Sequence, residues 1–284
     1  EAGATGWSRP RALDVPKPTR PAAAGAGATT APRPIGRLLS SAGGAGTVQP
    51  MTLATTAIVL AAGRGERLRP HTDHCPKPLL PVRGKPLIEW HLEALARAGV
   101  RQVVVNTAWL EDQFPPALGD GSRWGLTLHY SMEQRDHGGA LETAGGIAKA
   151  LRWLADPFWV VSGDVFVPGF DFGAETAARL VPGDLAHLWM APNPAHHAAG
   201  DFVLTPEGRL RPGASGAGGP TRTWASVGLF RPAMFDGIVP GTRMALRPRL
   251  ERAMAEDRLG GSAWDGEWTD VGTPQRWAAL EVLA

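Results

Sequence analysis

The chain has 284 residues, of which 43% are apolar and 20% charged, enough to bury a full α/β core in one domain with room for a small second module. Positions 1–50 hold six of the 29 Lys and Arg and two of the 27 Asp and Glu residues, so the body carries 23 basic and 25 acidic residues and the pI near 9.0 comes from the tail. This balance argues against a nucleic-acid partner, Cys75 alone excludes an internal disulfide, and the absence of an apolar run of roughly 18 residues argues against a membrane partner.

The first 50 residues form a Pro/Ala/Gly-rich tail that we predict to be disordered. They contain almost no large apolar side chains, so folding could not offset the lost chain entropy. Their Arg-rich, acid-poor character is faintly typical of a transit peptide, but Pro and Gly would interrupt its amphipathic helix. The alternative is an upstream extension of the reading frame, with Met51 as the natural start. We expect a tail over 1–50 and a domain over 51–284. The single cysteine and the lack of a long apolar run predict a reducing, cytoplasmic setting.

Short apolar runs alternate with helix-period segments from Thr55 onward. This alternation predicts a largely parallel sheet covered by helices on both faces, with ligands beyond the carboxyl ends of the strands. The predicted strands are 56–61, 102–106, 126–130, 158–164 and 185–191, and the predicted helices are 86–99 and 141–155.

The pattern is looser after about residue 200. We predict a hairpin around Thr205 to Gly208, a strand over 221–230, a helix over 245–256 and a strand over 264–272 that enters a turn. These segments complete the body of the chain.

A Gly- and Arg-rich loop follows the first strand, in the stretch "IVLAAGRGERLRPHTDHCPKPLLP" over 58–81. It lacks the third glycine of a dinucleotide fingerprint and the Gly-Lys-Ser/Thr ending of a P-loop. Gly63 and Gly65 would let the backbone approach a phosphate, and Arg67 and Lys77 would neutralise its charge. An ordinary surface turn is the alternative, but the prolines that flank Lys77 restrict its reach and favour a binding role.

The loop and five later segments resemble the sugar-1-phosphate nucleotidyltransferases. After "LAAGRGERLRP" and "PKPLLPVRGKPLIEW", the likeness continues in order through "VVVNTAW", "LETAGGI", "VSGDV", "NPAHHAAGDF" and "WTDVGTPQRW", across 57–283. It implies a Rossmann-like α/β fold of the nucleotide-diphospho-sugar transferase (GT-A) type, a three-layer sandwich with a mixed, mostly parallel sheet. Within the family, "NTAWL", "LGDGSRWGL" and "NPAHHAAGDF" look most like the branch that uridylylates N-acetylmuramate 1-phosphate.

Two acids at strand ends are candidate ligands for magnesium. Joining a sugar phosphate to a nucleoside triphosphate brings anionic groups together, and a divalent cation with hard oxygen ligands offsets their repulsion. Asp164 ends one predicted strand and Asp270 another, and the resemblance assigns both to Mg²⁺. Taken alone, Asp164 could be a turn residue, since Gly-Asp is common in turns.

The remaining chemistry needs positioning more than proton transfer. Lys77 and Arg67 would hold the phosphates, and an ionised sugar phosphate requires no general base, so Lys77, Arg67 and Asp164 are the predicted catalytic residues. His196 and His197 are adjacent and would face opposite sides of a strand, so we interpret them as loop or sugar-pocket residues.

The predicted binding residues flank the loop. By the resemblance, nucleotide contacts fall to Ala61, Ala62, Gly63, Gly65, Arg67, Lys77, Asn106, Glu133 and Gly145, and sugar contacts to Glu142, Gly146 and Asp201. The glycines at 145 and 146 would permit close approach of a ribose or sugar. Glu142 could instead be a solvated acid in the first turn of a helix, and Asp201 an acid that opens a hairpin.

Three departures from the family pattern affect specificity. Residues 135–140 lengthen the segment that normally reads the base, Ser226 replaces a glycine, and Ala245 stands where a lysine is common. Arg64 and Arg69 have no assigned role and are predicted to face solvent.

The expected substrates are an NTP, most simply UTP, and a sugar 1-phosphate, in a monomer or small homo-oligomer. Transfer to glucose or mannose 1-phosphate is the alternative within the class. A non-catalytic regulatory subunit that binds nucleotide sugars is the alternative from another class.

Overall fold

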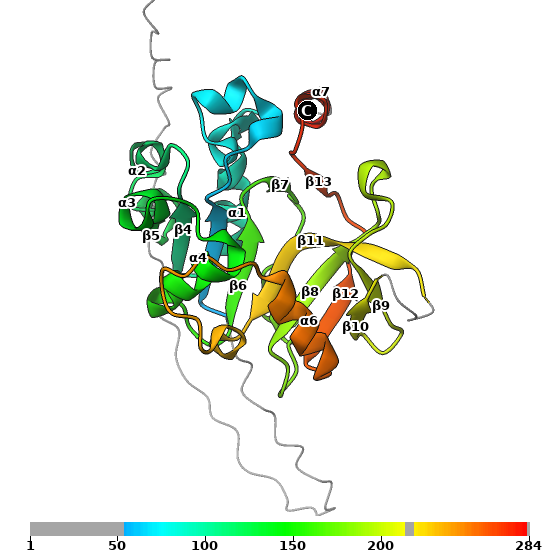
Figure 1. The fold of residues 1–284 in the computed structure, drawn as a ribbon. Helices are drawn as coiled ribbons and strands as arrows, with labels where there is room; N and C mark the ends of the chain where they lie inside the picture. The colour runs from blue at the N-terminus through cyan, green and yellow to red at the C-terminus, as the bar shows by residue number, and fades with distance from the viewer. Residues whose placement is uncertain (1–53, 214–218, 283–284) are drawn as a thin grey trace, which may run out of the picture. The chain divides into compact units, whose positions relative to one another are not determined.

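A central sheet of nine strands organises the described part of the chain, residues 54–213 and 219–282 of a computed structural model (Figure 1). The predicted tail, 1–50, lies outside the described residues. The order is β10-β9-β11-β6-β1-β4-β5, and β8 pairs with both β11 and β12. The strands are β1 (Thr56–Ala61), β4 (Gln102–Thr107), β5 (Thr127–Met132), β6 (Phe158–Ser162), β8 (Ala186–Ala191), β9 (Phe202–Leu204), β10 (Leu210–Pro212), β11 (Thr221–Phe230) and β12 (Leu259–Ala263).

The pairing directions make the sheet mixed. β1 is parallel to both β4 and β6, β4 is parallel to β5, and β12 is parallel to β8, whereas β11 runs antiparallel to its neighbours. The predicted α/β fold with a mixed, mostly parallel sheet is therefore confirmed. Two small ribbons lie outside the main sheet and pair β2 (Pro81–Val82) with β3 (Lys85–Pro86) and β7 (Val165–Phe166) with β13 (Thr269–Asp270).

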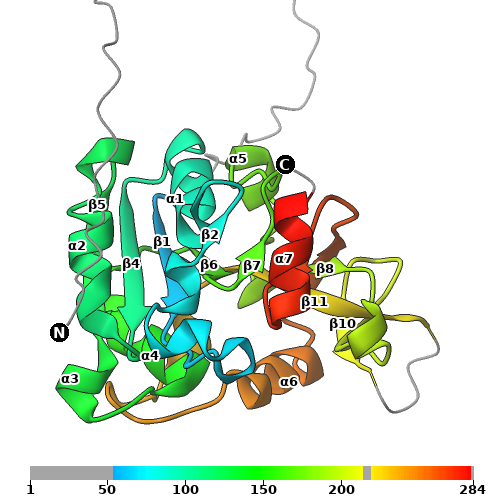
Figure 2. The ribbon, with the colours of Figure 1, turned by 90° about the horizontal axis from the view of Figure 1, so that it is seen from above.

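Alternation along β1 explains the layers. Ala57 and Val59 face a cluster that includes Leu92 and Leu95 of α1 (Leu87–Arg97), whereas Ile58 faces a cluster that includes α4 (Glu142–Ala150) and α6 (Arg247–Ala255). Because successive side chains of a strand point to opposite faces, one strand of continuous apolar residues buries both layers. Figure 2 shows helices on both sides of the sheet.

The other helices are short or late in the chain. They are α2 (Phe114–Leu118), α3 (Glu133–His137), α5 (Ala174–Ala177) and α7 (Pro274–Val282). None of the helices in the part of the chain that the structure describes has the length and apolar character of a membrane span.

The segment predicted as an insertion, 135–140, begins inside α3 and continues beyond its end at His137. The first N–H groups of α3 are capped by the buried Glu111, with Oε1 2.8 Å from Arg135 N and Oε2 3.1 Å from Gln134 N. A carboxylate at the N-terminal end of a helix satisfies donors that lack partners within the helix.

Ser226 lies at an irregularity of β11. The register against β8 shifts between Trp224 and Gly228, and Ser226 has a φ of 58°, in the left-handed region that glycine adopts without strain. The departure from glycine at this position therefore changes the backbone energetics as well as the size of the side chain.

Gly145 provides a test of packing around α4. Its N–H donates to Met244 O at 3.1 Å, and a Cβ at this position would lie 2.2 Å from Thr242 O. We expect Gly145→Ala to lower the free energy of unfolding by about 1–3 kcal/mol because main-chain atoms must move. Urea denaturation measures this loss, and Gly139→Ala, at a position with open space, is the control.

Candidate active site

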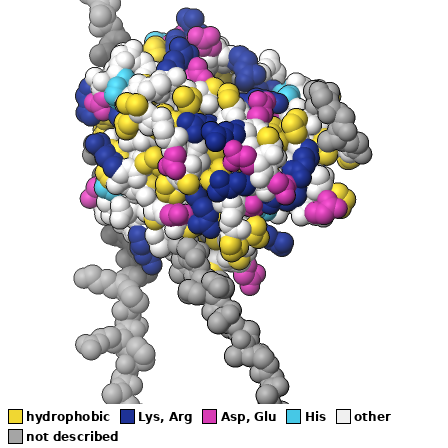
Figure 3. Space-filling model, turned by 60° about the horizontal axis from the view of Figure 1, so that its bottom comes forward, with side chains coloured by type: hydrophobic (Ala, Val, Ile, Leu, Met, Phe, Trp, Pro, Cys, Tyr) yellow, Lys and Arg dark blue, Asp and Glu magenta, His cyan; other side chains and the backbone are white. Residues whose placement is uncertain are grey.

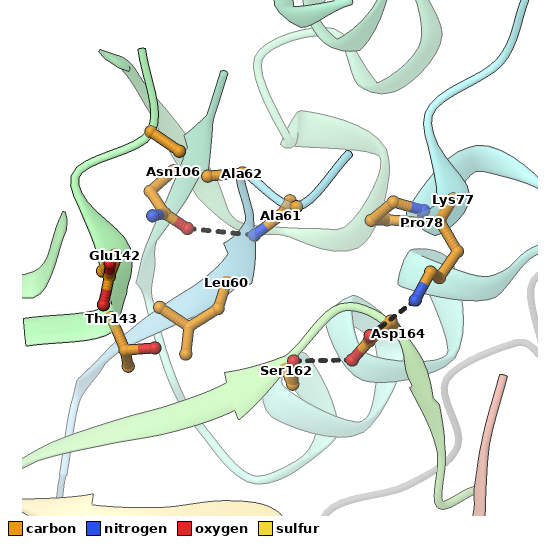
Figure 4. A pocket seen from close by; sticks show the side chains of 12 residues that line it. Leu60, Ala61, Ala62, Lys77, Pro78, Asn106, Glu142, Thr143, Ser162 and Asp164 are labelled. Carbon is orange, nitrogen blue, oxygen red and sulfur yellow. Dashed lines mark hydrogen bonds and ion pairs between the residues drawn. The ribbon is translucent and has the colours of Figure 1, made fainter. Parts of the chain in front are cut away.

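A cavity of about 320 Å³ opens at the carboxyl end of β1, where a parallel sheet is expected to bind ligands (Figure 4). Its wall combines the start of the Gly/Arg loop with the ends of β4 and β6 and the beginning of α4. The lining residues are Leu60, Ala61, Ala62, Gly63, Lys77, Pro78, Asn106, Ala140, Glu142, Thr143, Ser162 and Asp164. Seven predicted site residues therefore meet in one cavity. Of the 135–140 segment, Ala140 alone among these lining residues reaches it.

The Gly/Arg loop owes its shape to Gly65 and Thr72. Gly65 has a φ of 69°, and Thr72 Oγ1 donates to its carbonyl at 2.9 Å. A Cβ on Gly65 would lie 3.0 Å from Thr72 Cγ2 and 3.3 Å from Lys77 Cε. Glycine is thus required both by the left-handed backbone and by the close passage of Lys77.

Arg64 is a structural residue of this loop, which corrects the prediction that it faces solvent. Its guanidinium lies 3.5 Å from the centroid of the Trp109 ring and donates to Thr72 O at 3.1 Å and to Asp73 Oδ1 at 2.9 Å. Stacking and ion pairing together fix the loop against the segment after β4. Arg69, whose side chain is 61% exposed, does face solvent beside Asp73.

Lys77 and Asp164 form the charged centre of the cavity. Lys77 Nζ lies 2.8 Å from Asp164 Oδ2, and Ser162 Oγ donates to Asp164 Oδ1 at 2.7 Å (Figure 4). Burial opposes ionisation of Asp164, but the charge of Lys77 and the two hydrogen bonds prevail and hold its pKa below the ordinary value. The acid is therefore a carboxylate at neutral pH.

Asp270 approaches Asp164 through the β7–β13 ribbon. The pairing places Asp270 opposite Val165, and Val271 N donates to Asp164 O at 2.8 Å. Arg276 Nη2 donates to Asp270 Oδ2 at 2.8 Å, and His196 Nε2 lies 3.0 Å from Asp270 Oδ1. The ribbon thus brings together the two acids predicted to bind magnesium.

The chemistry of this donor pair fits a hard divalent cation. Asp270 Oδ1 is buried and has no aligned hydrogen-bond donor among the described residues, although His196 Nε2 lies 3.0 Å away, so this oxygen keeps a lone pair for a further ligand. Within the ranges that the structure describes, no cluster of three or more His, Cys, Asp or Glu could enclose a metal. Asp164 and Asp270 would therefore supply few ligands and leave the others to phosphate oxygens and water, as Mg²⁺ prefers.

Arg67 lies on the Asp270 side of the loop rather than in the wall of the cavity. It is exposed and forms no hydrogen bond or ion pair with another described residue, and a Cβ on Gly272 would lie 3.1 Å from its Nη2. Its guanidinium is available for an anion next to the two acids.

The buried side chains of Asn106 and Glu133 link three segments by hydrogen bonds behind the loop. Asn106 Oδ1 accepts from Ala61 N at 2.9 Å, Asn106 Nδ2 donates to Glu133 Oε1 at 2.8 Å, and Leu141 N donates to Glu133 Oε2 at 2.7 Å. Burial raises the pKa of Glu133 against the effect of these donors. The N–H of Ala61 is already satisfied by Asn106, so it is not free for a ligand, and contacts of Ala62 and Gly63 with the nucleotide stay a prediction.

Atoms of the protein itself leave no room for a side chain at Gly145 and Gly146. A Cβ on Gly145 would strike Thr242 O, and one on Gly146 would lie 2.5 Å from Glu133 Oε1. Neither glycine lines the cavity. Their contact with a ribose or sugar, like that of Glu133 with the nucleotide, stays a prediction.

A second cavity of about 270 Å³ adjoins the first and shares Glu142 and Thr143 with it. Asp201 lines this cavity, with Oδ2 2.8 Å from Trp224 N and Oδ1 3.2 Å from His197 Nε2. Glu142, with a φ of 59°, stands between the two cavities and accepts from Arg243 at 3.1 Å. The two acids predicted to bind the sugar thus share one pocket.

His196 and His197 lie in a short 3-10 helix over Ala195–His197 rather than on a strand. The two rings diverge, so that His196 reaches Asp270 and His197 reaches Asp201. Each histidine therefore lies beside a different acid, and their interpretation as loop or sugar-pocket residues stays a prediction.

Known proteins match the part of the chain that lines the first cavity. Residues 56–178 match the family model described as Nucleotidyl transferase. The chain is 49% identical to the N-acetylmuramate alpha-1-phosphate uridylyltransferase of Neisseria meningitidis serogroup B, over 80% of this chain and 97% of that protein. The chain belongs to the sugar-1-phosphate nucleotidyltransferase family. The resemblance drawn from its motifs is confirmed.

More distant nucleotidyltransferases extend the comparison. The protein of the same name from Caulobacter vibrioides is 32% identical over 80% of this chain and 95% of its own length. A UTP--glucose-1-phosphate uridylyltransferase of Synechocystis sp. is 30% identical over 79% of this chain, which spans 62% of that protein. A crystal structure of a Bacillus anthracis protein assigned as a glucose-1-phosphate thymidylyltransferase has a TM-score of 0.68 at 19% identity and covers 81% of this chain and 95% of its own, which supports the fold.

Four side chains of the nucleotidyltransferase site were not predicted from the sequence. Ser162 and Thr143 line the first cavity, Arg276 pairs with Asp270, and Arg247 lines the second cavity. Ser162 could have been found from its position two residues before Asp164 at a strand end. The others depend on contacts between distant segments.

His91 gives the nucleotidyltransferase a measurable response to acid. Its Nε2 donates to Val165 O at 2.9 Å, and burial lowers its pKa from 6.5 to about 4 against the opposing effects of Val165 and Asp164. Because the folded-state pKa is depressed, the stabilisation is complete above pH 6.5 and is lost as the pH falls toward 4. We expect this group to cost about 3 kcal/mol of unfolding free energy over that window.

Urea denaturation at pH 7 and pH 4.5 measures the effect. His91→Gln should show a smaller loss between the two pH values than the wild-type protein, whereas the exposed His74→Gln should keep the full loss. His187, whose burial also lowers its pKa to about 4, contributes to the slope that remains. An unchanged slope in His91→Gln would contradict the assignment.

Proposed function

We propose that the protein transfers the uridylyl group of UTP to N-acetylmuramate 1-phosphate and releases pyrophosphate. The observation that carries the proposal is the Lys77–Asp164 pair, 2.8 Å apart, in a cavity at the carboxyl end of β1. The substrates are taken from the name of the relative that is 49% identical. A role in recycling cell-wall sugars belongs to the same proposal.

The proposed reaction is an in-line attack by a phosphate oxygen. The oxygen of the sugar 1-phosphate forms a bond to the α-phosphorus of UTP while the bond from that phosphorus to the pyrophosphate oxygen breaks. The attacking group is already ionised, so no proton has to be removed, and catalysis rests on positioning and charge neutralisation. Lys77 is only 8% exposed and fixed by Asp164, so its charge is held at one point of the cavity.

Magnesium is the proposed cofactor, held by Asp164 and Asp270. When bound, the cation would neutralise phosphate charge and orient the phosphate oxygens. Lys77 and Arg67 would add positive charge from the loop, and Arg276 and His196 would keep Asp270 oriented. Glu142 and Asp201, in the second cavity, are the proposed partners of sugar hydroxyl groups.

Pyrophosphate release from a matrix of four nucleoside triphosphates and several sugar 1-phosphates tests the proposal. We expect UTP with N-acetylmuramate 1-phosphate to be the preferred pair. The name of the Neisseria meningitidis relative, which has the highest identity of those compared above, gives these substrates. EDTA should stop the release and excess Mg²⁺ should restore it. Release with glucose 1-phosphate but not with the muramate ester would overturn the sugar assignment.

Two variants test the charged centre. Lys77→Ala and Asp164→Asn should each lower kcat by at least about 100-fold, since each removes a fixed charge next to the reacting phosphates. Arg69→Ala, at an exposed position of the same loop, is the control and should stay within about twofold of the wild type. Circular dichroism checks that each variant folds, and near-normal activity in either folded variant would refute its role.

A further inference from the structure

The second cavity has a composition that its neighbour lacks. Beside the acids Glu142 and Asp201, its wall is largely apolar, and Arg247 alone of the described lining residues is basic. The lining residues are Glu142, Thr143, Asp201, Phe202, Trp224, Ala245, Leu246, Arg247 and Leu250. Because Glu142 and Thr143 belong to both cavities, the two cavities adjoin, and a ligand in the first can extend a substituent toward the second.

Arg247 is placed at the first residue of α6 with its charge accessible. Its guanidinium lies 5.1 Å from the centroid of the Phe202 ring, and its side chain is 54% exposed. Its Nε donates to Glu251 Oε1 at 2.9 Å, one turn further along the helix. An exposed pair of this kind contributes little, so a carboxylate ligand could replace Glu251 at small cost.

The acids of the cavity already have other partners. Asp201 accepts from Trp224 N at 2.8 Å and lies 3.2 Å from His197, whereas its distance to Arg247 Nη1 is 4.0 Å. Glu142 accepts from Arg243. Arg247 is the basic residue that lines this cavity, and its closest partner, Glu251, lies outside the lining. The two acids of the cavity are therefore not the closest partners of Arg247.

We propose that Arg247 binds the carboxylate of the sugar substrate. It would thereby favour a sugar phosphate that carries a carboxylate over one that carries a neutral group in its place. This proposal rests on the proposed function, in which the sugar carries a lactyl ether with one carboxylate. The guanidinium would pair with that carboxylate in a charge-assisted hydrogen bond. Trp224 and Leu246 would contact the methyl group of the same substituent.

The competing interpretation is that Arg247 only stabilises α6. The same helix offers a matched case, since Arg252 Nε donates to Glu256 at 2.7 Å and the two residues are four positions apart, as are Arg247 and Glu251. Arg252 lines a different cavity, one that contains none of the sugar-binding candidates. Figure 3 shows basic and acidic side chains standing side by side across one face of the molecule, so such pairs are ordinary on this surface.

The experiment compares two sugar phosphates of nearly the same shape, one with the lactyl carboxylate and one with the neutral carboxamide in its place. Steady-state kinetics with UTP are measured for N-acetylmuramate 1-phosphate and for its carboxamide, in the wild-type protein, Arg247→Gln and Arg252→Gln. We expect Arg247→Gln to raise the KM for the acid about tenfold with little change in kcat, and to leave the carboxamide unaffected. Arg252→Gln should change neither sugar. Glu251→Gln, which removes the competing carboxylate, should lower the KM for the acid.

The outcomes separate the two proposals. An equal loss on both sugars in Arg247→Gln, or no loss on either, would overturn the role of Arg247 and leave the proposed function intact. Failure of the wild-type protein to use N-acetylmuramate 1-phosphate would overturn the proposed function and the role of Arg247 with it.

Discussion

The antiparallel pairing of β7 with β13 is the contact on which the site depends. It joins two segments far apart in the sequence and sets Asp270 beside the strand that follows Asp164. The hydrogen bond from Val271 N to Asp164 O fixes this register at 2.8 Å. It is a direct main-chain link between the segment that carries Asp164 and the segment that carries Asp270.

The C-terminal helix strengthens the same contact from the other side. Trp277 of α7 donates to Pro81 O at 2.7 Å, and Glu281 accepts from Arg83 N at 2.6 Å. Leu68, Val271 and Leu280 share one buried cluster. Figure 1 shows α7 beside the loop that follows β1. The last helix therefore supports both the Gly/Arg loop and the ribbon that carries Asp270.

The fold was predictable where a segment carries its own signal. β1 was predicted at its observed bounds because a continuous apolar run between polar residues is typical of a buried strand. β12 was missed because its sequence, LGGSA, has the low strand propensity of glycine. Those glycines are needed for close packing, since a Cβ on Gly261 would lie 2.7 Å from Leu210 Cδ2. No local pattern reveals such a contact.

The same distinction applies to the site. Lys77 and Asp164 were predicted from motifs, and the structure joins them. Arg64 was misjudged because its partner Trp109 follows a different strand, and Arg247 was missed because its meaning depends on a cavity formed by several segments. The sequence thus indicates which chemistry is present, whereas the neighbours of each charge emerge only from the fold.

The hydrogen bonds of Met244 have a consequence for how specificity can change. Met244 O accepts from the N–H groups of Ala144 and Gly145, and Met244 N donates to Leu141 O. Helix α4, which borders the first cavity, is thereby tied through main-chain atoms to the segment that leads into α6 and the second cavity. The two cavities therefore share a wall that is held by main-chain hydrogen bonds. A substitution that displaces this backbone, such as Gly145→Ala, would alter both cavities together, whereas a change in a side chain that projects from the wall can alter one of them alone.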